Sequence, residues 1–289
     1  MLEEYGKAMR NFRENRGFSL RMLAEGIVDP STLAKYERGT TGLSFESLIP
    51  LLARLHITIG EFLYRARSFE QDPKAAFFSQ VTRAYLDEDI DMLHILNEQA
   101  TSKLATSPSR LPYDRLDLIT IRAATAMLQD TQLDANDATF ASGYFLENQD
   151  WYYYDLQSLR FICIFFSLED LLAISRMLFT SVNTYSRVGN SMQYVNEIAL
   201  EIIDGLISFG DLDNARKTIA DFDKQPTIIN SIAASLNLKE LSAALKYLDG
   251  QETSATTEFQ KVIDTLRWLS FNQKAKQLTD QWNRLTKKS

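Results

Sequence analysis

Residues 19–39 have the pattern of two short helices joined by a tight turn, SLRMLAEGIVDPSTLAKYERG. Ser19 is a favoured helix N-cap residue, and Leu23 follows it at helical spacing. Gly26 permits the left-handed backbone that a tight turn requires, and Asp29 followed by proline is a typical start for the second helix. This pattern predicts a helix-turn-helix, in which the second helix has the geometry to enter a DNA major groove.

The flanking residues predict three further helices. Residues 2–15 form an amphipathic helical pattern, and residues 44–55 form an apolar one. Thr58 and Glu61 have the spacing of a capping box that opens a fifth, short helix. Residues 1–65 are therefore predicted to be a five-helix domain.

The second helix of the motif has a buried and an exposed side. Leu33 and Tyr36 form its apolar stripe, whereas Ser31, Thr32 and Lys35 fall on the other faces. Small polar and basic side chains in this position are suited to reading DNA. We expect Thr32 and Lys35 to face base edges and Ser31 to lie near a phosphate or a base edge.

The segment resembles the DNA-binding domain of the xenobiotic-response-element, or Cro/repressor-like, family. Residues 31–39, STLAKYERG, match the family's recognition helix and the end of that helix. The resemblance implies an ion pair between Arg10 and Glu37 that braces the recognition helix. The resemblance also implies that other arginines bind DNA phosphates. The predicted DNA-binding residues are Arg13, Arg16, Ser31, Thr32, Lys35 and Arg38.

The net charge of −7 is divided unequally between the two parts of the chain. Residues 1–65 hold nine bases and eight acids, whereas the remainder holds 22 bases and 30 acids. A domain this weakly basic is expected to bind random DNA poorly. Useful affinity would come from a homodimer that contacts two half-sites of a double-stranded operator.

The rest of the chain has a helical pattern to its end, with few glycines or prolines and no sustained alternation typical of strands. Residues 66–74 are predicted to be a linker, and residues 75–289 a second domain. Turn-like segments beginning near Asp87, Ser167, Gly210 and Gly250 recur at multiples of about 40 residues. An all-α fold follows, with a degenerate tetratricopeptide-like helical repeat solenoid in the second domain; an irregular helical domain is the alternative.

The order of these parts resembles the Rgg family of transcriptional regulators, which belongs to a larger group of peptide-pheromone receptors with repeat domains. Residues 5–13, YGKAMRNFR, are similar to the family's opening helix, and residues 55–62, LHITIGEF, to the last helix of its DNA-binding domain. Residues 151–156, WYYYDL, resemble a segment common in the family's repeats. The resemblance spans the whole chain and implies a dimer regulated by a short signalling peptide.

The sequence predicts neither an enzyme nor a metal or cofactor site. The two histidines, His56 and His94, lie in different predicted domains, and no nucleotide-binding or nucleophile motif is present. The longest apolar stretch, residues 161–172, is too short to span a bilayer, and no signal peptide is recognised. With a single cysteine, Cys163, the chain is expected to be cytoplasmic.

The most unusual residue of the repeat domain is Arg160, a cation within an otherwise apolar helix. Such a charge needs either an acidic group of a ligand or a nearby Asp or Glu. We expect Arg160 to face the concave groove and bind a peptide carboxylate, with Asn190, Tyr194 and Asn230 as partners of the peptide backbone.

The predicted function is a homodimeric, peptide-controlled transcriptional regulator, with DNA and the peptide as partners and RNA polymerase as a further candidate. Two alternatives stay open. One is a regulator of the same architecture that responds to a small molecule or to no ligand. The other is a protein-interaction scaffold whose helix-turn-helix does not read DNA, which a salt-dependent, sequence-selective DNA shift would exclude.

Overall fold

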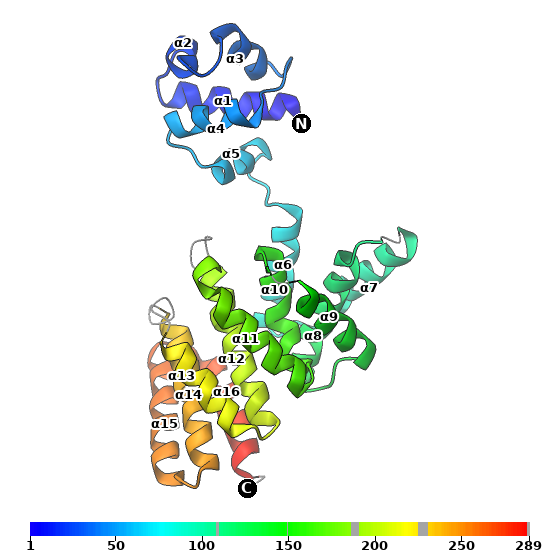
Figure 1. Ribbon diagram of the computed structural model, residues 1–289, viewed down its shortest axis with the longest axis vertical. Coiled ribbons are helices and arrows are strands. Elements are labelled where there is room, and N and C mark those ends of the chain that lie inside the picture. The colour runs from blue at the N-terminus through cyan, green and yellow to red at the C-terminus, as the bar shows by residue number, and fades with distance from the viewer. Residues whose placement is uncertain (108–109, 149, 186–190, 225–230, 288–289) are drawn as a thin grey trace. The chain divides into compact units, whose positions relative to one another are not determined.

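The protein is entirely helical in the part of the chain that the structure describes. The computed structural model covers residues 1–289 and describes all of them except residues 108–109, 149, 186–190, 225–230 and 288–289. Its described residues form helices joined by short turns, with no strand among them (Figure 1). They divide into two compact units, Met1–Gln80 and Val81–Ser289.

The first unit contains the five helices that the sequence predicts. They are α1 (Leu2–Asn15), α2 (Leu20–Ala24), α3 (Pro30–Glu37), α4 (Phe45–Arg54) and α5 (Ile59–Ala66). Their apolar faces form one core, in which Met9, Leu23 and Leu33 are fully buried. Because each short helix contributes only a few apolar residues, the helices depend on this shared core for their stability.

Local hydrogen bonds start these helices where the sequence indicates. The Ser19 side chain accepts a hydrogen bond from the Met22 amide at 3.2 Å, and Asp29 accepts one from the Ser31 amide at 2.8 Å. The capping box at α5 is confirmed: the Thr58 hydroxyl accepts from the backbone amide of residue 61, whose carboxylate accepts from the amide of Thr58. Each cap supplies an acceptor for an amide that has no partner within its helix.

The start of α1 lies directly against the end of α3. A Cβ added at Gly6 would lie 2.3 Å from the carbonyl oxygen of Tyr36. A Cβ added at Gly39 would lie 2.7 Å from the Cα of Glu3, and the φ of Gly39 is +72°. Both positions therefore require glycine, and the backbone of α1 sets the position of α3.

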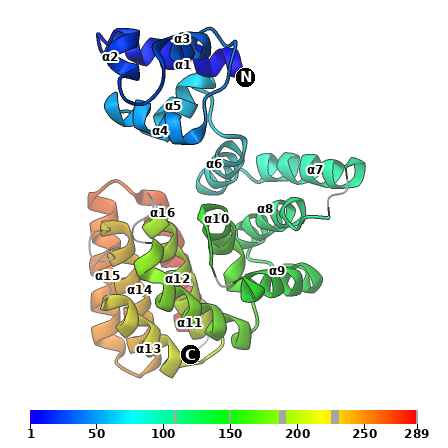
Figure 2. The same cartoon turned by 45° about the horizontal axis from the view of Figure 1, so that its top comes forward.

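From Pro73 onward the chain forms a series of packed helices. They are α6 (Pro73–Leu86), α7 (Ile90–Thr106), α8 (Tyr113–Gln129), α9 (Ala135–Glu147), α10 (Tyr153–Ile162), α11 (Leu168–Tyr185), α12 (Ser191–Ser208), α13 (Leu212–Asp223), α14 (Ile232–Leu248), α15 (Glu252–Trp268) and α16 (Asn272–Lys287), with a 3₁₀ turn, η1 (Cys163–Phe165), after α10. Helices adjacent in sequence pack in pairs, α7 on α8, α11 on α12 and α14 on α15 (Figure 2). This is the hairpin packing expected of a helical repeat domain.

The predicted repeat turns are confirmed. Gly210 and Gly250 have φ values of +76° and +79° and directly precede α13 and α15. Glu88, with a φ of +54°, lies in the turn before α7, and Ser167 precedes α11. None of the described helices combines the length and apolar composition needed to cross a bilayer.

The predicted linker and the division between the units differ in position. Residues 67–72 separate α5 from α6, within the predicted linker at 66–74. The division between the compact units falls further along, after Gln80 and inside α6. The helix thus begins in one unit and ends in the other, because its hydrogen-bond ladder continues through the boundary.

Candidate DNA-binding and ligand-binding sites

The predicted DNA-reading residues share one side of α3. Ser31 and Lys35 are exposed and Thr32 is half-buried. With a rotation of about 100° per residue, these three and Arg38, at the C-terminal end of α3, fall within about one third of the helix circumference. The opposite side is packed against the core through Leu33 and Tyr36. The structure therefore places Ser31, Thr32, Lys35 and Arg38 on one accessible face, and their contacts with DNA stay a prediction.

The predicted partner of Glu37 is wrong: Arg13, not Arg10, forms the ion pair. Arg13 Nε and Nη2 donate to the two carboxylate oxygens of Glu37 at 2.6 and 2.8 Å, and Nη1 donates to the Phe18 carbonyl at 3.0 Å. Arg10 instead pairs with Glu14 at 2.8 Å in solvent. The carboxylate of Glu37 raises the pKa of Arg13.

The positions of Arg10 and Arg13 around the axis of α1 explain why Arg13 is the partner of Glu37. The core-facing arc of α1 includes Tyr5, Met9 and Phe12, and Arg13 lies at its edge. Arg10 lies about 60° further round the helix, where it points into solvent. The side chains of Arg13 and Glu37 are only 11% and 5% exposed.

The correction also changes the predicted phosphate contacts. All three nitrogens of the Arg13 guanidinium already donate within the protein, so Arg13 braces α3 and is not free to bind a phosphate. Arg16 and Arg38 are exposed, and their binding to phosphates stays a prediction.

Arg54 is a structural residue that the sequence reasoning missed. From α4, its Nη1 donates to the carbonyl of Leu23 at 2.8 Å and to that of Glu25 at 2.6 Å. These carbonyls end α2 and have no partner within a helix of that length. Arg54 therefore joins the first helix of the motif to α4, a contact that spacing along the chain does not reveal.

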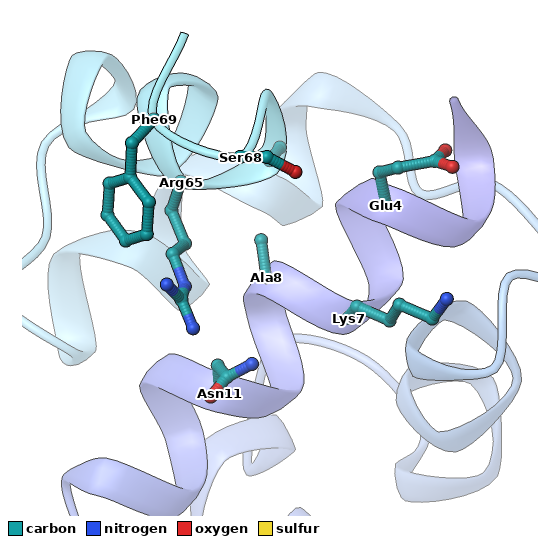
Figure 3. Close-up of a pocket in the computed structure, with 8 residues that line it drawn as sticks. Glu4, Lys7, Ala8, Asn11, Arg65, Ser68 and Phe69 are labelled. Atoms are coloured by element: carbon teal, nitrogen blue, oxygen red, sulfur yellow. The ribbon is translucent and has the colours of Figure 1, made fainter.

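A hollow of about 230 Å³ lies in the first unit, between α1 and the end of α5 (Figure 3). Its lining residues come from α1 and from α5 and the turn after it: Glu4, Lys7, Ala8, Asn11, Arg65, Ala66, Ser68 and Phe69. The Arg65 guanidinium stacks on the Phe69 ring at 4.6 Å from the ring centre. None of the lining residues belongs to α3, so this hollow is separate from the predicted DNA-reading face.

In the second unit, Arg160 has an acidic partner within the protein. Its Nη1 donates to Glu197 Oε2 at 2.6 Å, and its Nη2 donates to the hydroxyl of Thr82. The guanidinium carbon lies 4.4 Å from the ring centre of Phe161 and 5.1 Å from that of Tyr194. Arg160 thus connects α6, α10 and α12, with a side chain that is 7% exposed.

Of the three residues predicted to accompany Arg160, only Tyr194 can be placed. Its ring stacks edge-on against Tyr153 at 5.6 Å and lies over Arg160. Asn190 and Asn230 lie outside the described residues.

Helix α12 carries a polar stripe that sequence reasoning did not identify. One side of α12 is half-buried and carries Tyr194, Glu197, Glu201 and Asp204. Most of the other residues of this helix are buried. Burial raises the pKa of Glu201 to about 8, with a further contribution from Asp204. Burial also raises the pKa of Asp204. On α14, burial raises the pKa of Glu240 to about 8. Lys274 on α16 lowers the pKa of all three carboxyl groups. The only sequence signal for this group is the spacing of the acids on α12.

With the geometry in place, comparison with known proteins decides the family. Residues 93–280 match the sequence model of the HTH-type transcriptional regulator Rgg, C-terminal domain, and residues 9–62 match a helix-turn-helix model. The chain belongs to the Rgg family. The family's members are transcriptional regulators, so this Rgg-family chain is a helix-turn-helix regulator and not an enzyme.

Solved structures show the same fold over nearly the whole chain. A protein of Listeria monocytogenes EGD-e described as a transcriptional regulator has a TM-score of 0.79 at 14% identity, covering 100% of this chain and 99% of its own. The SHP pheromone receptor Rgg2 of Streptococcus dysgalactiae has a TM-score of 0.73 at 16% identity, covering 97% and 99%. Bacillus thuringiensis PlcR, solved with a peptide and DNA, has a TM-score of 0.62 at 14% identity, covering 96% and 99%.

Proposed function

We propose that this Rgg-family regulator acts in the cytoplasm as a homodimer that binds a two-fold-related DNA operator and is controlled by a short apolar peptide. The observation that carries the DNA-binding part is the accessible polar face of α3, whose other side is braced by the Arg13–Glu37 pair. The peptide part is supported by the solved relatives, of which one is a pheromone receptor and another was solved with a peptide. Arg160 already pairs with Glu197, but its buried Nε has no partner among the described residues.

In this proposal the DNA contacts divide into two kinds. Thr32 and Lys35 read base edges, and Ser31 lies near a phosphate or a base edge. Arg16 and Arg38 bind phosphates, which position the helix without reading the sequence. With a net charge close to zero in the first 65 residues, one copy binds weakly, and two copies on half-sites about one helical turn apart supply the affinity.

The DNA proposal is tested by selecting duplexes from a random library with the full chain. Enrichment of an inverted repeat with half-sites about 34–36 Å apart, or a multiple of that distance, supports the proposal. Lys35→Ala should abolish the enrichment, whereas Lys217→Ala, on the exposed side of α13, should leave it unchanged. Recovery of random sequences by the wild-type chain would favour the scaffold alternative, and light scattering on the same sample tests the dimer.

In the regulatory unit, Arg160 binds a carboxylate of the peptide and Tyr194 contacts its backbone, with Asn190 and Asn230 as further partners. Asn side chains suit this role because they both donate and accept hydrogen bonds. The peptide changes DNA binding, or contact with RNA polymerase, only through a difference in its affinity for the protein's states.

The peptide proposal is tested by capture from the medium of producer cells, followed by mass spectrometry of what the full chain retains. A retained peptide whose binding is lost in folded Arg160→Ala, but kept in the surface control Arg216→Ala, supports the proposal. If Arg160→Ala only lowers the melting temperature and binds the peptide normally, Arg160 is structural. Retention of a small molecule, or of nothing, favours the corresponding alternative.

A further inference from the structure

Arg160 has one hydrogen-bonding position without a partner, and a carboxylate would complete it. Its Nη1 is occupied by Glu197 and its Nη2 by the Thr82 hydroxyl. The Nε is buried, and among the described residues no acceptor lies within hydrogen-bonding distance of it. Buried polar groups in folded proteins nearly always have a partner, so this vacant donor points to a group that binds here in another state.

The vacant donor belongs to the edge of the guanidinium that holds carboxylates. Nε and Nη2 point the same way, and together they bind the two oxygens of a carboxylate in parallel. Arg13 demonstrates this geometry with Glu37, at 2.6 Å from Nε and 2.8 Å from Nη2. In Arg160 the Nε has no partner, and the Nη2 contacts only a neutral group, the Thr82 hydroxyl.

The surroundings of Arg160 determine which contact an incoming carboxylate would replace. The rings of Phe161 and Tyr194 lie close to the guanidinium, and Glu197 occupies the far nitrogen. Thr82 contacts Nη2, one of the two nitrogens of the Nε–Nη2 edge. A carboxylate that binds this edge needs the Nη2 that Thr82 now contacts, and it leaves the bond from Nη1 to Glu197 in place.

Thr82 lies on α6, the helix that begins in the DNA-binding unit and ends in the repeat unit. One turn later, Tyr85 packs edge-on against Phe161 at 5.4 Å, so two neighbouring contacts attach the end of α6 to α10. We propose that a ligand carboxylate takes the place of Thr82 on Arg160 and thereby loosens the last turns of α6. This inference rests on the proposed peptide function and adds the route by which binding reaches the DNA-binding unit, a change in the order of a shared helix.

The route is tested without any ligand by Thr82→Val in the full chain, which removes the hydroxyl and keeps the side-chain shape. Amide hydrogen exchange in residues 81–86 should accelerate about tenfold, as expected for the loss of one charge-assisted hydrogen bond. The affinity of Thr82→Val for a duplex selected by the wild-type chain should also differ from that of the wild-type chain. Thr101→Val, an exposed threonine on α7, is the matched control and should change neither. Unchanged exchange in Thr82→Val overturns the proposal.

The carboxylate preference is tested with sodium formate as the probe. In Thr82→Ala, formate should raise the melting temperature above that in sodium chloride of equal ionic strength, and it should not do so in Thr82→Ala/Arg160→Met. No formate effect, or an equal effect in both variants, overturns the assignment of this edge. These outcomes are independent of the capture experiment, so failure to retain any peptide refutes the proposed function separately.

Discussion

Replacing Glu37 by glutamine tests whether the Arg13–Glu37 pair supports α3. The substitution keeps the shape of the side chain and removes the charge that accepts two hydrogen bonds from Arg13. Removing one partner of a fully buried ion pair costs about 3–5 kcal/mol. Here Arg13 keeps its bond to the Phe18 carbonyl, and its Nη2 lies 3.4 Å from Glu14, which is 50% exposed. We therefore expect a smaller loss, about 2–3 kcal/mol.

The measurement must report on the first unit alone. All three tryptophans, Trp151, Trp268 and Trp282, lie in the repeat unit, so tryptophan fluorescence does not follow the unfolding of the DNA-binding unit. Amide hydrogen exchange of residues 33–37 in the full chain follows the unfolding of that unit. A loss of 2–3 kcal/mol corresponds to exchange about 30- to 160-fold faster.

Two controls decide the interpretation. Glu14→Gln breaks the half-exposed pair with Arg10, and exchange in α3 should accelerate by less than about threefold. Arg13→Met should resemble Glu37→Gln, whereas Arg10→Met should resemble Glu14→Gln. If Arg10→Met destabilises α3 as much as Arg13→Met does, the reasoning from helical phase is refuted.

Five further substitutions test other parts of the structure. Gly6→Ala places a Cβ 2.3 Å from a backbone carbonyl of α3, so the first unit should lose about 1–3 kcal/mol of stability by hydrogen exchange; Gly143→Ala, in open space on α9, should instead stabilise the repeat unit by about 0.5–1 kcal/mol. Burial raises the pKa of Glu201 from 4.5 to about 8, so between these values the folded state holds a proton that the unfolded state releases, and the free energy of unfolding falls as the pH rises. Glu201→Gln should therefore raise the urea midpoint of the tryptophan transition clearly above pH 8 and hardly at all near pH 4.5, and a pH-independent gain would contradict this. Thr32→Ala should weaken binding to a selected duplex by about 1–3 kcal/mol and binding to random DNA much less; an equal loss on both removes Thr32 from the reading face. Arg16→Ala should lower the slope of binding against salt concentration by about one unit in a titration, without a change in melting temperature.

The sequence alone determined the features that depend on neighbours within a few residues. The helix-turn-helix could be placed at residues 19–39 because a cap, a turn glycine and an apolar stripe act within one or two helical turns. The capping box at Thr58 and the turns at Gly210 and Gly250 were found for the same reason. The exposed side of α3 followed from its periodicity once its buried side was known.

Tertiary structure decided which distant side chains meet. Arg10 and Arg13 are both arginines on one amphipathic helix, and only the rotation of α1 against α3 selects Arg13 as the partner of Glu37. The lone cation Arg160 was visible in the sequence, but its partners on α6 and α12 are 78 and 37 residues away. Such contacts depend on the path of the whole chain and on helix packing, whereas local sequence patterns carry information only about the turn or helix that contains them.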